Sequence, residues 1–195
     1  QMLDEKISGF LADTLLPTGD LVLDAEEKKR RVKFFTNPEL CRITEDLVLT
    51  EPYFDCRGRN IVTSGNEDFV REFLYEDEGL HAEVAKLRVA FMNNAQALLH
   101  GDLHSGSIFV NETDLRVLDP EFAFYGPIGY DTGNFIANMI FAYANGLYTM
   151  EEGEEKKAYL EWILDTIEEF CGRFIENAKQ LMREKSNDRQ MRSEL

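Results

Sequence analysis

The 195-residue sequence predicts an α+β fold that is mostly α-helical and contains one small β-hairpin. Apolar residues recur at helical spacing along most of the chain, and only residues 107–119 have the composition of two short strands joined by a polar turn. A chain of this length can bury about 70% of the surface that it exposes when unfolded, which is enough for one core. We therefore expect residues 1–195 to form one domain, or most of one.

The first part of the chain predicts three short helices separated by turns. Residues 3–15 carry apolar side chains at a helical period, and residues 16–20 form a turn. Residues 25–34 predict a helix whose acidic and basic side chains form a solvated face. Asn37, which precedes Pro38, indicates a turn into a third short helix.

The middle of the chain predicts a polar loop and then a long helical segment. Residues 55–66 contain two glycines and many polar groups, which indicates a loop. Apolar residues then follow a helical period over residues 67–97, with an interruption near Gly79. This helix, or broken pair of helices, leads into the segment that carries the strongest motif.

Two further helices are expected after the hairpin. Residues 131–143 are apolar around so much of the helix that we expect them to be buried at the centre of the domain. Asp131 is suitably placed to cap the start of this helix. Residues 155–185 carry an apolar stripe that predicts a long packing helix, and we expect the polar end 186–188 to fray.

The motif that carries chemistry is His100-Gly101-Asp102, with Asp119 and Glu121 placed after the hairpin. Asp102 would lie on a tight loop before the first strand. If Asp119 ended the second strand, strand alternation would aim its side chain and that of Glu121 to one side. Kinases use carboxylates arranged in this way to hold a hydroxyl nucleophile beside metal-bound nucleotide phosphates. The sequence therefore predicts phosphoryl transfer.

The types of residue suit that reaction. Phosphoryl transfer has a loose, highly charged transition state, so the protein mainly positions the reacting oxygens while a metal ion neutralises charge. Asp102 would orient the substrate hydroxyl and take its proton, which contributes roughly 10²–10⁴-fold in rate. Mg²⁺ accepts one or two carboxylates together with phosphate oxygens, and Asp119 and Glu121 offer such carboxylates.

These residues also resemble a known family. The His-Gly-Asp loop, with a polar residue five places after the aspartate, resembles the catalytic loop of aminoglycoside phosphotransferases, choline kinases and related small-molecule kinases. The resemblance to the 5-methylthioribose kinase family is closer, because that family has a serine at the place of Ser107 and Asp-x-Glu at the place of Asp119 and Glu121. Residues 35–47 and 122–131 are similar to the same family.

The resemblance covers roughly residues 34–144 and implies a protein-kinase-like C-terminal lobe. It implies ATP and Mg²⁺ as cofactors and a small sugar as substrate, with Asp102 as the base and Asp119 and Glu121 as the metal ligands. His104 and Ser107 are the candidates for contact with the nucleotide or its metal ion. In the family, an aspartate at the place of residue 131 braces the catalytic loop through backbone amides.

Other features of such kinases are absent from this sequence. An N-terminal lobe normally supplies a Gly-rich loop and a strand lysine that hold the phosphates. The family also binds its sugar with an arginine pair that would follow Leu195. We therefore expect a C-terminal lobe truncated at both ends and inactive alone, within an intact enzyme that forms homodimers.

Simpler interpretations remain open for several residues. His100 suits a hydrogen-bonded core histidine better than a proton carrier, and His104 suits a structural role as well as a phosphate contact. Ser107 can cap a turn as well as bind Mg²⁺ or water. For the chain as a whole, the alternatives are an aminoglycoside, choline or homoserine kinase lobe, and a non-catalytic binding remnant of the kinase fold.

Composition limits the partners and the compartment. A net charge of −16 argues against binding to nucleic acid or to an anionic membrane. Three widely spaced cysteines, Cys41, Cys56 and Cys171, fit reduced thiols. No apolar run approaches the roughly 20 residues that span a bilayer, and the first residues lack the apolar core of a signal peptide. We therefore expect a cytoplasmic protein.

Overall fold

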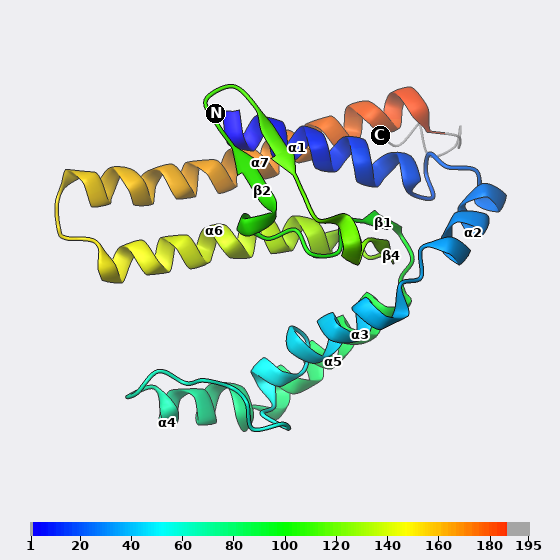
Figure 1. Cartoon of the computed structure of the whole chain (residues 1–195). Coiled ribbons are helices and arrows are strands. Elements are labelled where there is room, and N and C mark those ends of the chain that lie inside the picture. Colours follow the sequence, from blue (N-terminus) through cyan, green and yellow to red (C-terminus); the bar gives the residue numbers. More distant parts are fainter. Residues whose placement is uncertain (1, 187–195) are drawn as a thin grey trace.

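The computed structural model describes residues 2–186 and shows a helical body from which an arm projects (Figure 1). The body contains α1 (Met2–Leu15), α6 (Gly129–Thr149) and α7 (Glu154–Lys185), together with four short strands. The arm contains α3 (Pro38–Leu47), α4 (Glu67–Val70) and α5 (Glu78–Asn93), and α2 (Ala25–Phe34) precedes it. The predicted α+β fold with mostly helical content is confirmed.

The core of the body forms where α1 and α6 pack on α7 (Figure 1). The apolar stripe of α1 is fully buried at Ile7 and Leu11, as its helical spacing predicts. Phe135 of α6 and Phe170 of α7 bring their ring centroids to 4.6 Å. These contacts make α7 the support on which the other two helices rest.

The four strands form two antiparallel pairs rather than one. The predicted hairpin joins β2 (Ile108–Val110) to β3 (Leu115–Val117) and is confirmed. A second pair, β1 (Ala97–Leu99) with β4 (Phe124–Gly126), was not predicted. Three-residue strands so far apart in the chain have no turn between them that could signal pairing, so packing at long range decides it.

The arm confirms the predicted helices and the interruption near Gly79, but α5 ends at Asn93 instead of continuing to residue 97. Residues 71–75 form a π-helical turn, and α5 begins after Asp77. The Asp77 side chain accepts a hydrogen bond from the backbone N–H of Leu80 at 2.8 Å, which caps the helix. Residues 55–66 contain no helix or strand, as expected. Of the end predicted to fray, residues 187 and 188 lie outside the described part.

Helix α6 departs from its prediction at its start and on one of its faces. It begins at Gly129, and Asp131 does not cap it. The expected central burial is wrong for one face, where Ile140 is 52% exposed and Phe141 is 68% exposed. The physical reason is that α7 covers one side of α6 while the arm diverges from the other side (Figure 1).

None of the helices within residues 2–186 combines the length and the apolarity that crossing a membrane requires.

Candidate active site

The loop that follows β1 carries Asp102 and is held in place by Asp131 of α6. Asp131 is fully buried, and its carboxylate accepts hydrogen bonds from the backbone N–H groups of His100 at 2.6 Å and Gly101 at 3.0 Å. Burial raises the pKa of Asp131, and the two amide donors partly oppose that rise. The interpretation of Asp131 as a brace for the loop is therefore confirmed, and its interpretation as a helix cap is wrong.

Gly101 brings this loop directly against the turn that carries Asp119 and Glu121. Its φ angle is +84°, a conformation that favours glycine. A Cβ at this position would lie only 2.2 Å from the carbonyl oxygen of Phe122, which immediately follows Glu121. Only a residue without a side chain allows the two loops to approach so closely.

His100 links the same two loops from inside the protein. It is nearly buried, and its Nε2–H donates to the carbonyl oxygen of Leu118 at 2.7 Å. Its Nδ1 faces the backbone N–H of Asp102 at 3.3 Å and accepts from it. Because both ring nitrogens are engaged with backbone groups, His100 is a structural core histidine, as the sequence favoured.

The turn after β3 has a different geometry from the one predicted. Asp119 lies two residues beyond the end of β3, with a left-handed φ of 59°, and residues 120–122 form a 3₁₀ turn. Strand alternation therefore does not orient Asp119 and Glu121, and that part of the prediction is wrong. The hairpin itself stays closed at this end, because the backbone N–H of Leu118 donates to the carbonyl of Ser107 at 2.9 Å.

Asp119 and Glu121 are exposed, and their carboxylate oxygens are the kind of donor atom that a hard cation prefers. Among residues 2–186, neither carboxylate has a hydrogen-bond or ion-pair partner. The same residues contain no group of three or more histidine, cysteine, aspartate or glutamate side chains placed to hold a metal ion. Two carboxylates with water and phosphate oxygens are the ligand set that Mg²⁺ commonly takes, so the residues present fit this ion.

His104 is held in one tautomer by its own loop. The backbone N–H of Gly106 donates to His104 Nδ1 at 3.0 Å, so in the neutral ring the proton is on Nε2. That Nε2 lies 3.6 Å from Asp102 Oδ2 and 3.4 Å from Ser107 Oγ. Since Nε2 is the donor, His104 cannot take a proton from Ser107, and it presents an N–H beside Asp102.

Ser107 is buried and used within the loop. Its hydroxyl donates to the carbonyl oxygen of Asp102 at 3.1 Å. This bond confirms the interpretation of Ser107 as a residue that caps the turn. Binding of Mg²⁺ or water by Ser107 stays a prediction.

Two supporting asparagines were missed by the sequence analysis. Asn138 of α6 accepts hydrogen bonds at Oδ1 from the backbone N–H of Ser105 at 3.2 Å and from its hydroxyl at 3.1 Å. Asn37 donates through Nδ2 to the carbonyl of Glu121 at 2.8 Å. Asn138 is seven residues after Asp131, which places both on one helix face, and this spacing was the available signal. Asn37 had no such signal because its partner is far away in the chain.

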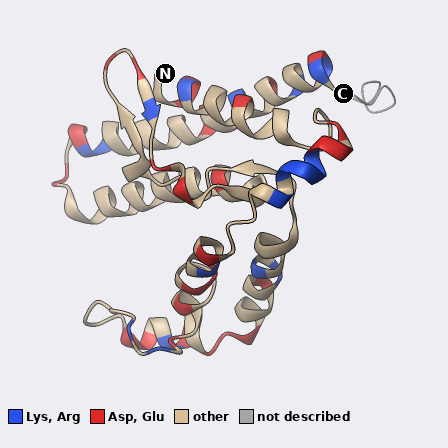
Figure 2. Ribbon diagram, turned by 45° about the vertical axis from the view of Figure 1, so that its right-hand side comes forward, with Lys and Arg blue, Asp and Glu red and all other residues tan. Residues whose placement is uncertain are grey.

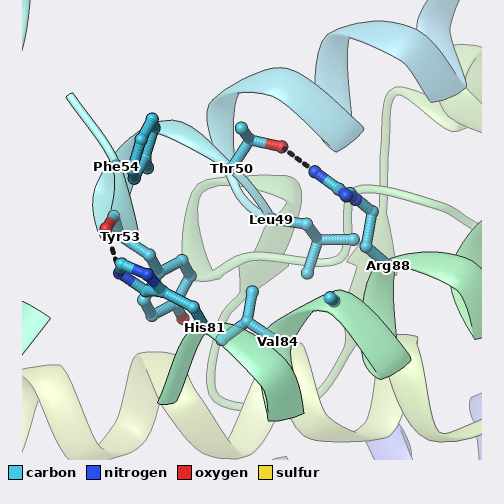
Figure 3. Close-up of a pocket in the computed structure, with 8 residues that line it drawn as sticks. Leu49, Thr50, Tyr53, Phe54, His81, Val84 and Arg88 are labelled. Carbon is cyan, nitrogen blue, oxygen red and sulfur yellow. Dashed lines mark hydrogen bonds between the residues drawn. The ribbon is translucent and has the colours of Figure 1, made fainter. Parts of the chain in front are cut away.

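A separate pocket lies on the arm (Figure 3). It has a volume of about 270 Å³ and is bordered by His81, whose Nε2 donates to the carbonyl of Tyr53 at 2.8 Å, and by Arg88. None of the five predicted site residues lines it. The candidate active site is therefore the surface formed by the two adjoining loops and not this pocket.

Comparison with known proteins identifies the family. The model of the phosphotransferase enzyme family matches residues 36–165, which include both loops. The chain belongs to the phosphotransferase enzyme family. The matched region also contains Asp131 and Asn138, so the supports of the loop lie inside it.

The chain is similar to several proteins named methylthioribose kinase. It is 49% identical to one from Geobacillus thermodenitrificans over 139 residues, which are 71% of this chain and 35% of that protein. It is 41% identical to one from Escherichia coli over 180 residues, 92% of this chain and 43% of that protein. Methylthioribose kinase 1 of Oryza sativa is also 41% identical, over 90% of this chain and 42% of its own length. The chain spans less than half the length of these relatives.

Proposed function

We propose that the chain is the C-terminal lobe of an ATP-dependent kinase that phosphorylates the C1 hydroxyl of 5-methylthioribose. One observation supports this above the others: Gly101 holds the Asp102 loop against the turn of Asp119 and Glu121, in a chain similar to proteins named methylthioribose kinase. A positioned carboxylate beside two exposed, unpaired carboxylates is what transfer of a phosphoryl group to an alcohol requires.

In this proposal each residue has one task. Asp102 accepts the proton of the attacking hydroxyl and orients it. His104 presents its Nε2–H on the same side and donates to a phosphate oxygen. Asp119 and Glu121 would hold Mg²⁺, which neutralises phosphate charge when bound. Asp131 keeps the Asp102 backbone in place, because it occupies the two amides that precede that residue.

The rest of the proposed enzyme lies outside the 195 residues. We infer a nucleotide-binding N-terminal lobe, because this acidic chain supplies no Gly-rich loop or strand lysine for the phosphates. A homodimer, a cytoplasmic location and inactivity of the isolated chain belong to the same proposal.

A chimaeric enzyme tests the proposed reaction. The matched region of the Geobacillus thermodenitrificans protein is replaced by the corresponding part of this chain, and ADP release is followed with ATP and methylthioribose. Activity with choline, homoserine or an aminoglycoside instead of methylthioribose would contradict the proposed substrate.

Substitution of the base then tests its role. Asp102→Ala should lower kcat roughly 10²–10⁴-fold at an unchanged melting temperature. Asp165→Ala, at an exposed position on α7, serves as the matched control and should leave kcat unchanged. Full turnover in Asp102→Ala would remove Asp102 as the base.

A further inference from the structure

The structure has an apolar groove where the arm meets α6. Its volume is about 480 Å³. The residues that line it come from the segment after α3, from α5, from the link before α6 and from the start of α6. None of them is charged: Leu49, Leu87, Ala90, Phe91, Pro127, Gly129, Tyr130, Gly133, Asn134 and Ala137.

An exposed apolar stripe continues this groove along α6. Residues 132–150 contain no Asp, Glu, Lys or Arg, and the α6 ribbon is tan along most of its length in Figure 2. Ile140, Phe141, Ala144 and Tyr148 recur at the spacing of one helix face, in line with the groove residue Ala137. Each of these four is exposed, Ile140 at 52%. A contiguous exposed apolar surface of this kind marks an interaction site.

The groove is connected to the candidate active site through α6 itself. Asp131 and Asn138 hold the catalytic loop from one face of this helix. The apolar stripe occupies another face, rotated by about 100° around the helix axis, since an α-helix turns about 100° per residue. A partner that covers the stripe therefore also fixes the helix on which the loop rests.

We propose that a polypeptide segment from outside these 195 residues occupies the groove, as a helix that presents an uncharged apolar face. The relatives carry more than half of their length outside the matched region, which leaves ample chain for such a segment. The groove and the stripe together extend along α6 from Gly133 to Tyr148, about 22 Å at 1.5 Å per residue, which suits a helix of several turns better than a small molecule.

Cross-linking in the chimaeric protein tests the occupant. A photoreactive benzoylphenylalanine replaces Phe141, a change of aromatic side chain at an exposed position. Cross-links should form within one polypeptide, to peptides from the Geobacillus part. The control places the same group at Ile61, which is 98% exposed on the arm. Cross-links from residue 141 to a second copy, or no more cross-linking than at residue 61, would overturn the proposal.

A stability comparison gives an independent test that needs no catalysis. Phe141→Glu should leave the melting temperature of the isolated chain within about 2 °C of the unsubstituted chain, because this side chain is exposed there. The same substitution should lower the melting temperature of the chimaera by more than about 4 °C, because a charge would enter a covered apolar face. Equal effects in the two proteins would contradict the proposal, whatever the outcome of the kinase assay.

Discussion

Asp131→Asn tests whether one buried carboxylate holds the catalytic loop. The substitution keeps the shape of the side chain but replaces one acceptor oxygen by an NH₂ group. One of the two backbone N–H groups, of His100 or of Gly101, then faces a donor instead of the acceptor that it meets now at 2.6 or 3.0 Å. Because Asp131 is fully buried, water cannot replace the lost partner.

The expected loss of stability is about 2 kcal/mol. A buried donor left without an acceptor costs about 1–3 kcal/mol. The loss is reduced because the neutral amide is less costly to bury than the carboxylate, whose pKa burial raises. Asp131→Ala leaves both amides without an acceptor, so its loss should be about twice as large.

Urea denaturation and thermal unfolding, both followed by circular dichroism at pH 7, measure these differences. Asp131→Asn should lower the melting temperature by about 4–8 °C, and Asp165→Asn at an exposed position should change stability by less than about 0.5 kcal/mol. If Asp131→Asn were as stable as its control, the two hydrogen bonds would not be what holds the loop.

The difference in stability between the wild type and Asp131→Asn should change with pH in a definite direction. Since the pKa of Asp131 in the folded protein lies above its ordinary value of 3.8, the folded state binds the proton more tightly than the unfolded state. The stability of the wild type relative to Asp131→Asn should therefore be greatest below about pH 4 and fall as the pH rises through the folded pKa.

Three further predictions concern other named positions. Gly101→Ala should destabilise the protein by more than about 2 kcal/mol in urea denaturation, because its Cβ would meet a carbonyl oxygen at 2.2 Å, whereas Gly129→Ala, with open space around it, should not. Ellman's reagent at pH 8 should label the exposed Cys56 in the folded protein but Cys41 only after unfolding. The reason is that Cys41 is buried, which raises the pKa of its thiol to about 11. Rapid labelling of both cysteines in the folded protein would contradict this prediction. Hydrogen bonds from Arg59 lower the pKa of the Glu51 carboxyl below its ordinary value of 4.5. The interaction between these two side chains therefore stabilises the folded protein above that pH, and this stabilisation is lost as the pH falls. Glu51→Gln should therefore lower the melting temperature at pH 7 more than at pH 3, and equal effects would refute this sign.

The sequence by itself determined the features that depend on neighbours along the chain. The helix over residues 25–34, the β2–β3 hairpin and the positions of Asp102, Asp119 and Glu121 around it follow from local spacing and turn composition. These features are set by residues close together in the sequence, so a pattern within a short window is enough to predict them.

Only the tertiary structure decided the features that join distant segments. It pairs β1 with β4, turns Asp131 from a helix cap into the brace of the catalytic loop, and leaves one face of α6 open where burial was expected. In each case the deciding contact joins groups some thirty residues apart, or depends on how far the arm diverges from the body. Periodicity shows that a side chain is apolar or can accept a hydrogen bond, but the partner that it meets is fixed by packing in three dimensions.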